Sequence, residues 1–366
     1  MISELHLDNF KCFKDQSMIL RDLTLLTGMN GMGKSTVLQS LLLLRQSVRE
    51  NMLPRIGLLL NGRLTQLGTA ADVIFRGAER DEIGIRVISA SVATQWRFRY
   101  GRPTDDVLAI IEEPPDLPTM SVFGPHFHYL SAERLGPRYI HDMSSFEVEQ
   151  QLQMGPDGRY AVAFLEAYSK NRVSAGLHHK MAVDRSVRSE VMAWLGEISP
   201  GVQLFIQPYP ELGRMALSMG FEGDRIQAKK FTAPNVGFGL SYVLPVLVAI
   251  LASPVGTMIL LENPEAHLNP GGQVAMGQLL ALGAQSGLQV IVETHSDHVL
   301  NGVRVATKKG MIDAAKVAMH YFDRVMGEDG FTHRVQSPVL DREGRIDKWP
   351  TGFFDQWEKS LDQLLG

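Results

Sequence analysis

The chain opens with a strand pattern that leads into a glycine-rich loop. Residues Ile2–Leu7 alternate between apolar and polar side chains, as a half-buried strand does, and Phe10–Phe13 is predicted to continue this strand into a hairpin. The short apolar run Leu23–Thr27 is followed by the loop Gly28–Thr36 (GMNGMGKST) and by the apolar run Val37–Leu44. This order predicts a buried strand, a glycine loop and a helix.

The middle of the chain changes from strand-like to helical patterns. Residues 55–110 are strand-like and punctuated by glycine, for example at Ile83–Val92 and Gln95–Tyr100, and Glu112–Pro118 (EEPPDLP) is a proline-rich loop. No heptad repeat persists through residues 140–200, so we expect a compact helical insertion there and no long coiled coil. The helices predicted within it are Phe146–Gln153, Ala161–Ser169 and Ser186–Ile198.

A regular α/β pattern returns after about residue 230. Leu240–Leu251 is predicted to be a helix and Met258–Leu261 a buried strand. Gln273–Ala284 follows as a helix and Leu288–Val292 as a second buried strand. A strand–helix–strand unit of this kind favours a parallel sheet with helices on its faces.

Composition narrows the class of protein. The 366 residues suffice for one large domain or two moderate ones, and 36 basic against 40 acidic residues give a net charge of −4. This balance weakens a purely nucleic-acid-binding role but allows a local basic patch. The single cysteine, Cys12, excludes an intrachain disulfide and indicates a cytoplasmic protein. The N-terminus does not resemble a signal peptide, and the longest apolar stretch, Val243–Ala252, is too short to span a membrane.

The loop Gly28–Thr36 fits the phosphate-binding pattern G-x-x-x-x-G-K-[ST]. Its glycines allow the backbone to turn N–H groups toward an anion, and the following helix directs its positive dipole end at the same phosphates. Lys34 is placed to reach the β- and γ-phosphates of ATP, and the Ser35 hydroxyl is placed to ligate Mg²⁺. The residues predicted to bind the nucleotide here are Asn30, Gly31, Met32, Gly33, Lys34, Ser35 and Thr36.

A phosphate-binding loop of this type needs a second carboxylate on the magnesium side. Glu262 ends the buried run TMILLE, and ligands bind at the carboxyl ends of strands in such sheets. Glu262 is therefore predicted to be a magnesium ligand together with Ser35.

Three segments resemble a known class of proteins. The runs LLENPEAHLNP (Leu260–Pro270) and VETHSDHVLNGVR (Val292–Arg304) resemble ABC-type ATPases of the SMC/RecF/OLD-nuclease class, which in bacteria are often called AAA family ATPases. The run DKWPTGFFDQW (Asp347–Trp357) resembles the end of one bacterial subgroup of this class, which also has the ENPEAHL motif. The resemblance implies an α/β P-loop NTPase fold of the ABC-ATPase type. This fold has a mixed sheet flanked by helices, an N-terminal antiparallel β part and, here, a helical insertion.

The same resemblance implies roles for further residues. Ala266–Asn269 corresponds to a loop at a dimer interface, and His295 corresponds to a histidine that senses the γ-phosphate. The segment Asn235–Ser241 (NVGFGLS) resembles a divergent signature loop that contacts the nucleotide of the other subunit through Gly237, Gly239 and Ser241.

The resemblance also suggests a division of the chain. Residues 1–139 form the N-terminal half of the ATPase head, residues 140–220 the helical insertion, and residues 221–366 the C-terminal half. OLD-type nucleases append a nuclease domain after the ATPase, but only about 70 residues follow His295 and they lack acids spaced for two metals. We therefore expect no nuclease domain.

One position departs from the family pattern. ABC-type sites usually place a glutamate that polarises water directly after the magnesium-side acid, and here that position is Asn263. A neutral amide orients water but cannot accept its proton, and a positioned base is worth about 10²–10⁴ in rate. Glu265, Glu293 and His295 lie nearby in sequence, and Glu265 is the first candidate to activate water. The alternative is slow hydrolysis, in which a long-lived ATP-bound dimer is the signal.

Other features have an ordinary structural explanation beside a functional one. Arg134 and Arg138, in YLSAERLGPR, contact phosphate, a neighbouring subunit or DNA, or else form a structural ion pair. His126 and His128 are spaced like metal ligands, but no further cluster completes a zinc site. Short clusters of basic residues more often form a solvent-exposed face than a nucleic-acid contact. The aromatic residues near the end of the chain are expected to pack against the core. These clusters are Lys229–Lys230, His178–Lys180, Arg185 with Arg188, and Lys308–Lys309, and the aromatics are Trp349, Phe353, Phe354 and Trp357.

The sequence thus predicts an ATPase that uses ATP and Mg²⁺, forms a homodimer or a higher assembly, and regulates an effector such as a nuclease or toxin. The effector and its defence or DNA-maintenance setting are implied by the resemblance. Two alternatives stay open: a RecF/SMC-like head that clamps DNA when ATP is bound, and a nearly inactive scaffold gated by nucleotide. A transporter subunit is disfavoured, because no membrane-coupling loop is recognisable.

Overall fold

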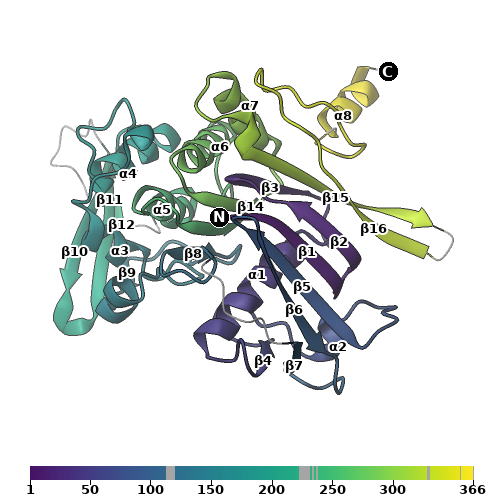
Figure 1. Ribbon diagram of the computed structural model, residues 1–366. Helices are drawn as coiled ribbons and strands as arrows, with labels where there is room; N and C mark the ends of the chain where they lie inside the picture. Colours follow the sequence, from purple (N-terminus) through teal and green to yellow (C-terminus); the bar gives the residue numbers. More distant parts are fainter. Residues whose placement is uncertain are drawn as a thin grey trace. The chain divides into compact units, whose positions relative to one another are not determined.

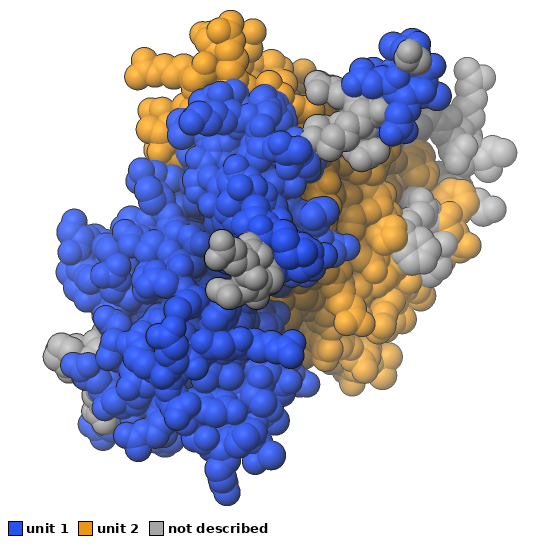
Figure 2. All heavy atoms as spheres, turned by 90° about the vertical axis from the view of Figure 1, so that its right-hand side faces the viewer, with its two compact units in different colours: residues 1–124, 317–339, 346–366 blue, residues 125–316, 340–345 orange. Residues whose placement is uncertain are grey.

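The protein folds into two compact units. The structure is a computed structural model, and it describes residues 1–112, 120–221, 231–232, 235, 238–327, 330–354 and 356–365. Unit 1 comprises residues 1–124, 317–339 and 346–366, and unit 2 comprises residues 125–316 and 340–345 (Figure 2). This grouping differs from the three consecutive segments predicted above, because part of the C-terminal region packs with the N-terminal strands.

Unit 1 contains a six-stranded antiparallel sheet in the order β2-β1-β5-β6-β7-β4 (Figure 1). The predicted hairpin is confirmed, since β1 and β2 pair from Glu4 opposite Ile19 to Phe10 opposite Phe13. Alternate side chains of these strands are buried, including Trp96 and Phe98. The strands are β1 (Ile2–Phe10), β2 (Phe13–Ile19), β4 (Gly57–Leu59), β5 (Glu82–Ser89), β6 (Val92–Arg99) and β7 (Val107–Glu112), and the short helix α2 is Ala70–Val73.

The predicted strand, loop and helix around the P-loop are also in unit 1. Strand β3 (Leu23–Gly28) leads through the loop into helix α1 (Lys34–Arg49), which buries most of its length. Strand β3 pairs in parallel with β15 (Val317–Gly327), which pairs in antiparallel with β16 (Gly330–Gln336). The Thr27 hydroxyl on β3 donates to the His320 carbonyl on β15 at 3.2 Å. Helix α8 (Gln356–Leu365) lies near the end of the chain.

Unit 2 contains the predicted strand–helix–strand unit. Strand β13 (Met258–Glu262) pairs in parallel with β14 (Gln289–Glu293) and with β8 (Phe127–Leu130), so the expected parallel sheet is confirmed. Side chains of β13 and β14 are almost wholly buried, which explains their continuous apolar runs. The helices are α5 (Phe238–Leu251), α6 (Pro270–Gln285) and α7 (Asp297–Lys308).

The segment expected to be a helical insertion contains strands as well as helices. The predicted helices appear as η1 (Phe146–Gln150), α3 (Ala161–Tyr168) and α4 (Val187–Ile198). The strands were not predicted, and β11 pairs with β9, β10 and β12 in a small antiparallel sheet. These strands are β9 (Ile140–Asp142), β10 (Val202–Tyr209), β11 (Arg214–Phe221) and β12 (Phe231–Thr232), and the short helices are η2 (Ala175–Leu177), η3 (Pro210–Leu212) and η5 (Ala314–Lys316).

The predicted fold class is confirmed: α/β, with an antiparallel N-terminal sheet, mixed strand pairing around the P-loop strand, and flanking helices. Residues 113–119 of the proline-rich loop lie outside the described residues. Among the helices that the structure describes, none has the length and apolar character needed to cross a membrane.

Candidate nucleotide site

The P-loop is held in a conformation that favours glycine. Gly28, Gly31 and Gly33 have φ angles of 129°, 74° and 103°, where other L-residues are strained. A Cβ on Gly33 would lie 2.6 Å from Cys12 Sγ and 2.7 Å from a ring carbon of Phe13. The loop therefore depends on both the backbone freedom and the missing side chain of Gly33.

The lysine of the loop is held against the loop's own carbonyl groups. Lys34 is buried, and its Nζ donates to the carbonyls of Gly28 at 2.9 Å and Met29 at 2.7 Å. An ammonium group positioned in this way adds a positive charge beside the loop's N–H groups.

The remaining loop residues divide into exposed and buried positions. Asn30 and Gly31 are exposed, whereas Met32 and Thr36 are buried and Ser35 is half-buried. Helix α1 has 16 residues and no acidic side chain in its first turn, so its N-terminus is not neutralised locally. These features fit a phosphate group.

Glu262 ends strand β13 in unit 2 and is fixed by two donors. Its Oε1 accepts from the Tyr129 hydroxyl at 2.9 Å, and its Oε2 accepts from the Ala132 backbone N–H at 3.0 Å. Burial and the neighbouring charge of Glu262 raise the pKa of Tyr129, so this hydroxyl keeps its proton. Tyr129 is not among the site residues predicted from the sequence.

Arg134 fixes the backbone that follows Glu262. Its Nη1 donates to the carbonyls of Ser131 at 2.9 Å and Glu262 at 2.7 Å, and its Nη2 donates to the Asn263 carbonyl at 2.6 Å. Arg134 is 3% exposed, and burial lowers the pKa of its guanidinium. These carbonyl contacts were not among the roles expected for Arg134, which were a contact with phosphate, a neighbouring subunit or DNA, or an ion pair with an acid.

We expect Arg134→Ala to destabilise the protein by about 3 kcal/mol, because it leaves buried carbonyl groups without a donor. Thermal unfolding of the purified variant measures this loss. The matched control is Arg138→Ala, since Arg138 is exposed and its removal should change stability by less than about 0.5 kcal/mol. Equal effects of the two substitutions would contradict the carbonyl-binding role.

Asn263 has a backbone conformation that suits asparagine. Its φ angle is 45°, in the left-handed region that asparagine tolerates better than most residues. Its N–H donates to the Glu293 carbonyl at 2.8 Å, which links the ends of β13 and β14. Its side-chain Oδ1 is buried and has no hydrogen-bond partner among the described residues.

Glu265 has an environment typical of a tuned acid–base group. It is 8% exposed, its Oε1 accepts from the His295 backbone N–H at 2.9 Å, and its Oε2 is buried without a partner in the described part of the chain. Burial raises the pKa of Glu265, and the His295 N–H, its own backbone N–H, the neighbouring Thr294 hydroxyl and the charge of Arg134 offset only part of this effect. A buried carboxylate with one unused oxygen is a candidate general base.

His295 lies between β14 and α7 and is exposed. Its backbone is tied to Glu265, so unit 2 gathers Glu262, Asn263, Glu265 and His295 around the ends of two neighbouring strands.

The predicted signature loop is described only in part. Gly237 lies outside the described residues, and Gly239 and Ser241 lie in the first turn of α5. A Cβ on Gly239 would meet the His267 carbonyl at 2.7 Å, so α5 closely approaches the loop Ala266–Asn269. The Ser241 Oγ is buried and lacks a hydrogen-bond partner within the described residues.

The two predicted magnesium ligands belong to different units, Ser35 to unit 1 and Glu262 to unit 2, so their joint site stays a prediction. The described residues contain no cluster of three or more His, Cys, Asp or Glu side chains suited to a metal ion.

The other sequence features have mainly structural surroundings. The Nδ1 of His178 lies 2.5 Å from the Oε1 of Glu190, and the Nε2 of His179 lies 3.1 Å from the Oε1 of Glu197. Arg188 contacts Glu166 at 3.5 Å, and Lys229–Lys230 lie outside the described residues. In the tail, Phe353 is buried and its ring contacts those of Tyr321, Trp349 and Phe354, which confirms the aromatic anchor for these residues. The side chain of Trp357 is not described.

Three family models match parts of the chain. One described as "AAA ATPase domain" matches residues 1–91, which include the P-loop. One described as "AAA domain, putative AbiEii toxin, Type IV TA system" matches residues 152–301, which include Glu262, Glu265 and His295. A third, "Protein of unknown function (DUF3696)", matches residues 312–364. No curated protein matches the sequence.

Solved structures of SMC heads are similar to the chain at low identity. The SmcHead bound to the C-winged helix domain of ScpA has a TM-score of 0.49 at 14% identity, over 93% of this chain and 98% of that chain. The SMC head domain from Thermotoga maritima has a TM-score of 0.44 at 12% identity, over 91% of this chain and 98% of that chain. The Smc head domain with an extended coiled coil bound to the C-terminal domain of ScpA derived from Pyrococcus furiosus has a TM-score of 0.45 at 12% identity, over 100% of this chain and 99% of that chain. The two ATPase-domain family models relate this chain to AAA-type ATPases.

Proposed function

We propose that the protein binds ATP with Mg²⁺ and hydrolyses it as an ABC-type ATPase. The observation that carries this proposal is the loop between β3 and α1, where glycines with positive φ and a buried lysine surround the start of a long helix. Backbone N–H groups, the dipole of α1 and Lys34 bind phosphate oxygens, and Ser35 and Glu262 hold the metal. When bound, Mg²⁺ neutralises phosphate charge.

In this proposal, Glu265 accepts the proton of the attacking water. Its raised pKa supports the role, and so does its buried Oε2, which has no hydrogen-bond partner within the described part of the chain. Arg134 and Tyr129 are positioning residues, because they fix the backbone and carboxylate of Glu262. His295, whose backbone is tied to Glu265, reports the γ-phosphate to α7.

We further propose that ATP assembles two copies of the chain and that the assembled state controls an effector protein. The buried Ser241 hydroxyl in the first turn of α5, which has no hydrogen-bond partner among the described residues, supports a contact with nucleotide from a second subunit. The family model that matches residues 152–301 is described as a putative AbiEii toxin of a Type IV TA system, and this description supports a toxin–antitoxin setting for the proposed effector.

A second candidate is a slow ATP-gated switch, and Asn263 favours it. A glutamate in the left-handed conformation of Asn263 would be strained, so the usual water-activating residue is disfavoured at this position. The ATP-bound dimer then persists long enough to bind a partner before hydrolysis, and formation of the dimer is the regulatory event.

We expect mass measurement by light scattering to show a dimer with MgATP and a monomer with ADP or no nucleotide. The Lys34→Ala variant is the control and should stay monomeric under all three conditions. A monomer with saturating MgATP would contradict the proposed assembly. Turnover measured on the same samples separates the two candidates, because the switch retains its dimer while it hydrolyses slowly.

A further inference from the structure

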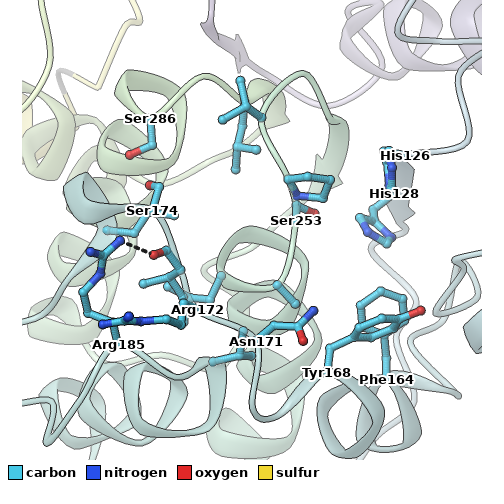
Figure 3. A pocket seen from close by; sticks show the side chains of 18 of the residues that line it. His126, His128, Phe164, Tyr168, Asn171, Arg172, Ser174, Arg185, Ser253 and Ser286 are labelled. Atoms are coloured by element: carbon cyan, nitrogen blue, oxygen red, sulfur yellow. Dashed lines mark hydrogen bonds between the residues drawn. The ribbon is translucent and has the colours of Figure 1, made fainter.

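Unit 2 contains a pocket that the proposed ATPase does not use. It has a volume of about 460 Å³, within the range of small-molecule sites. Its walls come from β8, from α3 and the loop that follows it, from the end of α5, and from the residues just after α6 (Figure 3). None of the residues assigned to nucleotide or metal lines it.

One side of the pocket offers hydrogen-bond donors and positive charge. The Arg185 Nη2 donates to the Val173 carbonyl at 2.6 Å, which fixes the guanidinium, while its Nε is buried without a partner among the described residues. The hydroxyls of Ser174 and Ser286 are likewise buried and unpartnered within the described residues. Figure 3 shows these three side chains and Arg172 on the same side of the pocket.

The opposite side is aromatic. The rings of Phe164 and Tyr168 lie 4.6 Å apart between centroids, and His128 meets Phe164 edge-on at 5.4 Å. Figure 3 shows these three rings with His126 on the side away from the arginines. Such a wall accepts the face or edge of another ring.

No described residue that lines the pocket carries a carboxylate. Asp184, outside the lining, is close enough to Arg172 for the positive charge of Arg172 to help lower the Asp184 pKa, but the Asp184 carboxylate already accepts from the Ser186 N–H at 2.8 Å. The Arg185 Nε and the hydroxyls of Ser174 and Ser286 therefore lack an acceptor among the described residues. A bound anion supplies one, since arginine pairs favourably with phosphate and carboxylate.

We propose that this pocket binds a small organic anion that carries an aromatic ring, of about the size of a nucleoside monophosphate. Arg172, Arg185 and the two serine hydroxyls hold the phosphate or carboxylate group, and the ring lies against the aromatic wall. This site is separate from the P-loop, so the proposal holds even if the chain does not hydrolyse ATP.

Calorimetric titration of the full chain with AMP tests the proposal, with adenosine and inorganic phosphate as the two half-ligands. We expect AMP to bind more tightly than either half-ligand. Arg172→Ala and Ser286→Ala should each weaken AMP binding, the arginine variant by about tenfold or more because a charge-assisted contact is lost. Lys170→Ala is the matched control, since it removes one exposed positive charge near Arg172 that does not line the pocket, and it should change affinity by less than about twofold.

The same titration with Lys34→Ala separates the pocket from the P-loop. We expect the AMP affinity of this variant to equal that of the unaltered chain. Binding that is lost in Lys34→Ala but kept in Arg172→Ala would place AMP at the P-loop and overturn the proposal. Equal affinities for AMP and inorganic phosphate would overturn the role of the aromatic wall, and no AMP binding in any form of the chain would overturn the site.

Discussion

Gly33→Ala is expected to weaken MgATP binding by about a hundredfold or more. The φ of 103° strains any side-chain-bearing residue, at a cost of about 1–3 kcal/mol. The added Cβ also overlaps Cys12 Sγ at 2.6 Å and a Phe13 ring carbon at 2.7 Å. The loop relieves the backbone strain and the overlap by moving. Its backbone N–H groups then no longer point toward the same phosphate position. Titration of a fluorescent ATP analogue into the purified variant measures the effect.

Gly31→Ala is the matched control in the same loop. Gly31 also has a positive φ, of 74°, but a Cβ there has no described atom within 4 Å. Only backbone strain acts, so we expect a loss of about tenfold or less. If both substitutions weaken binding equally, the contact of Gly33 with Cys12 and Phe13 is not what shapes the loop. Addition of Cys12→Ala to Gly33→Ala should recover part of the affinity, because it removes one of the two overlapping groups.

Glu265→Gln is expected to lower kcat by about 10²–10⁴ while nucleotide affinity changes little. Glutamine preserves the size of the side chain and can still accept from the His295 N–H, but it cannot take a proton from water. Steady-state phosphate release at several enzyme concentrations, together with nucleotide titration, measures the two quantities separately.

The pH dependence of kcat provides a second readout for Glu265. A general base acts in its deprotonated form, and burial raises the pKa of this carboxyl. We therefore expect kcat to fall as pH decreases, starting at a higher pH than an ordinary glutamate would give, and we expect this decline to vanish in Glu265→Gln. Asn263→Ala is the companion variant. A large loss of kcat in Asn263→Ala with little loss in Glu265→Gln would assign water activation to the asparagine instead.

The sequence was most informative where one segment determines its own structure. The apolar run before Gly28, the glycine loop and the apolar run after it specify β3, the P-loop and α1 without reference to distant residues. The same holds for β13, α6 and β14, because buried parallel strands are short continuous apolar runs. Glu262 and Glu265 were identified for this reason, as acids next to such a strand.

Contacts between distant segments were not predictable from pattern. Arg134 binds the carbonyls of Glu262 and Asn263, which lie 128 and 129 residues away in sequence. Backbone carbonyls are present at every residue, so no side-chain type in the sequence indicates this partner. The small sheet around β11 was missed because the helical periods of residues 140–200 dominated the interpretation of the whole segment. The pocket was missed for a related reason, since its lining residues come together only in the folded unit.

The pairing of β3 with β15 has a consequence for synthesis of the protein. Thr27 and His320, joined across these strands, are 293 residues apart. At about 5–20 residues per second, the ribosome needs roughly 15 to 60 seconds to make the β15 partner after β3 has emerged. A nascent chain therefore carries its phosphate-binding segment without the neighbouring strand through most of translation. In the proposed function, nucleotide binding in this unit depends on a nearly complete chain, and we expect products of interrupted translation to bind ATP less well than the full chain.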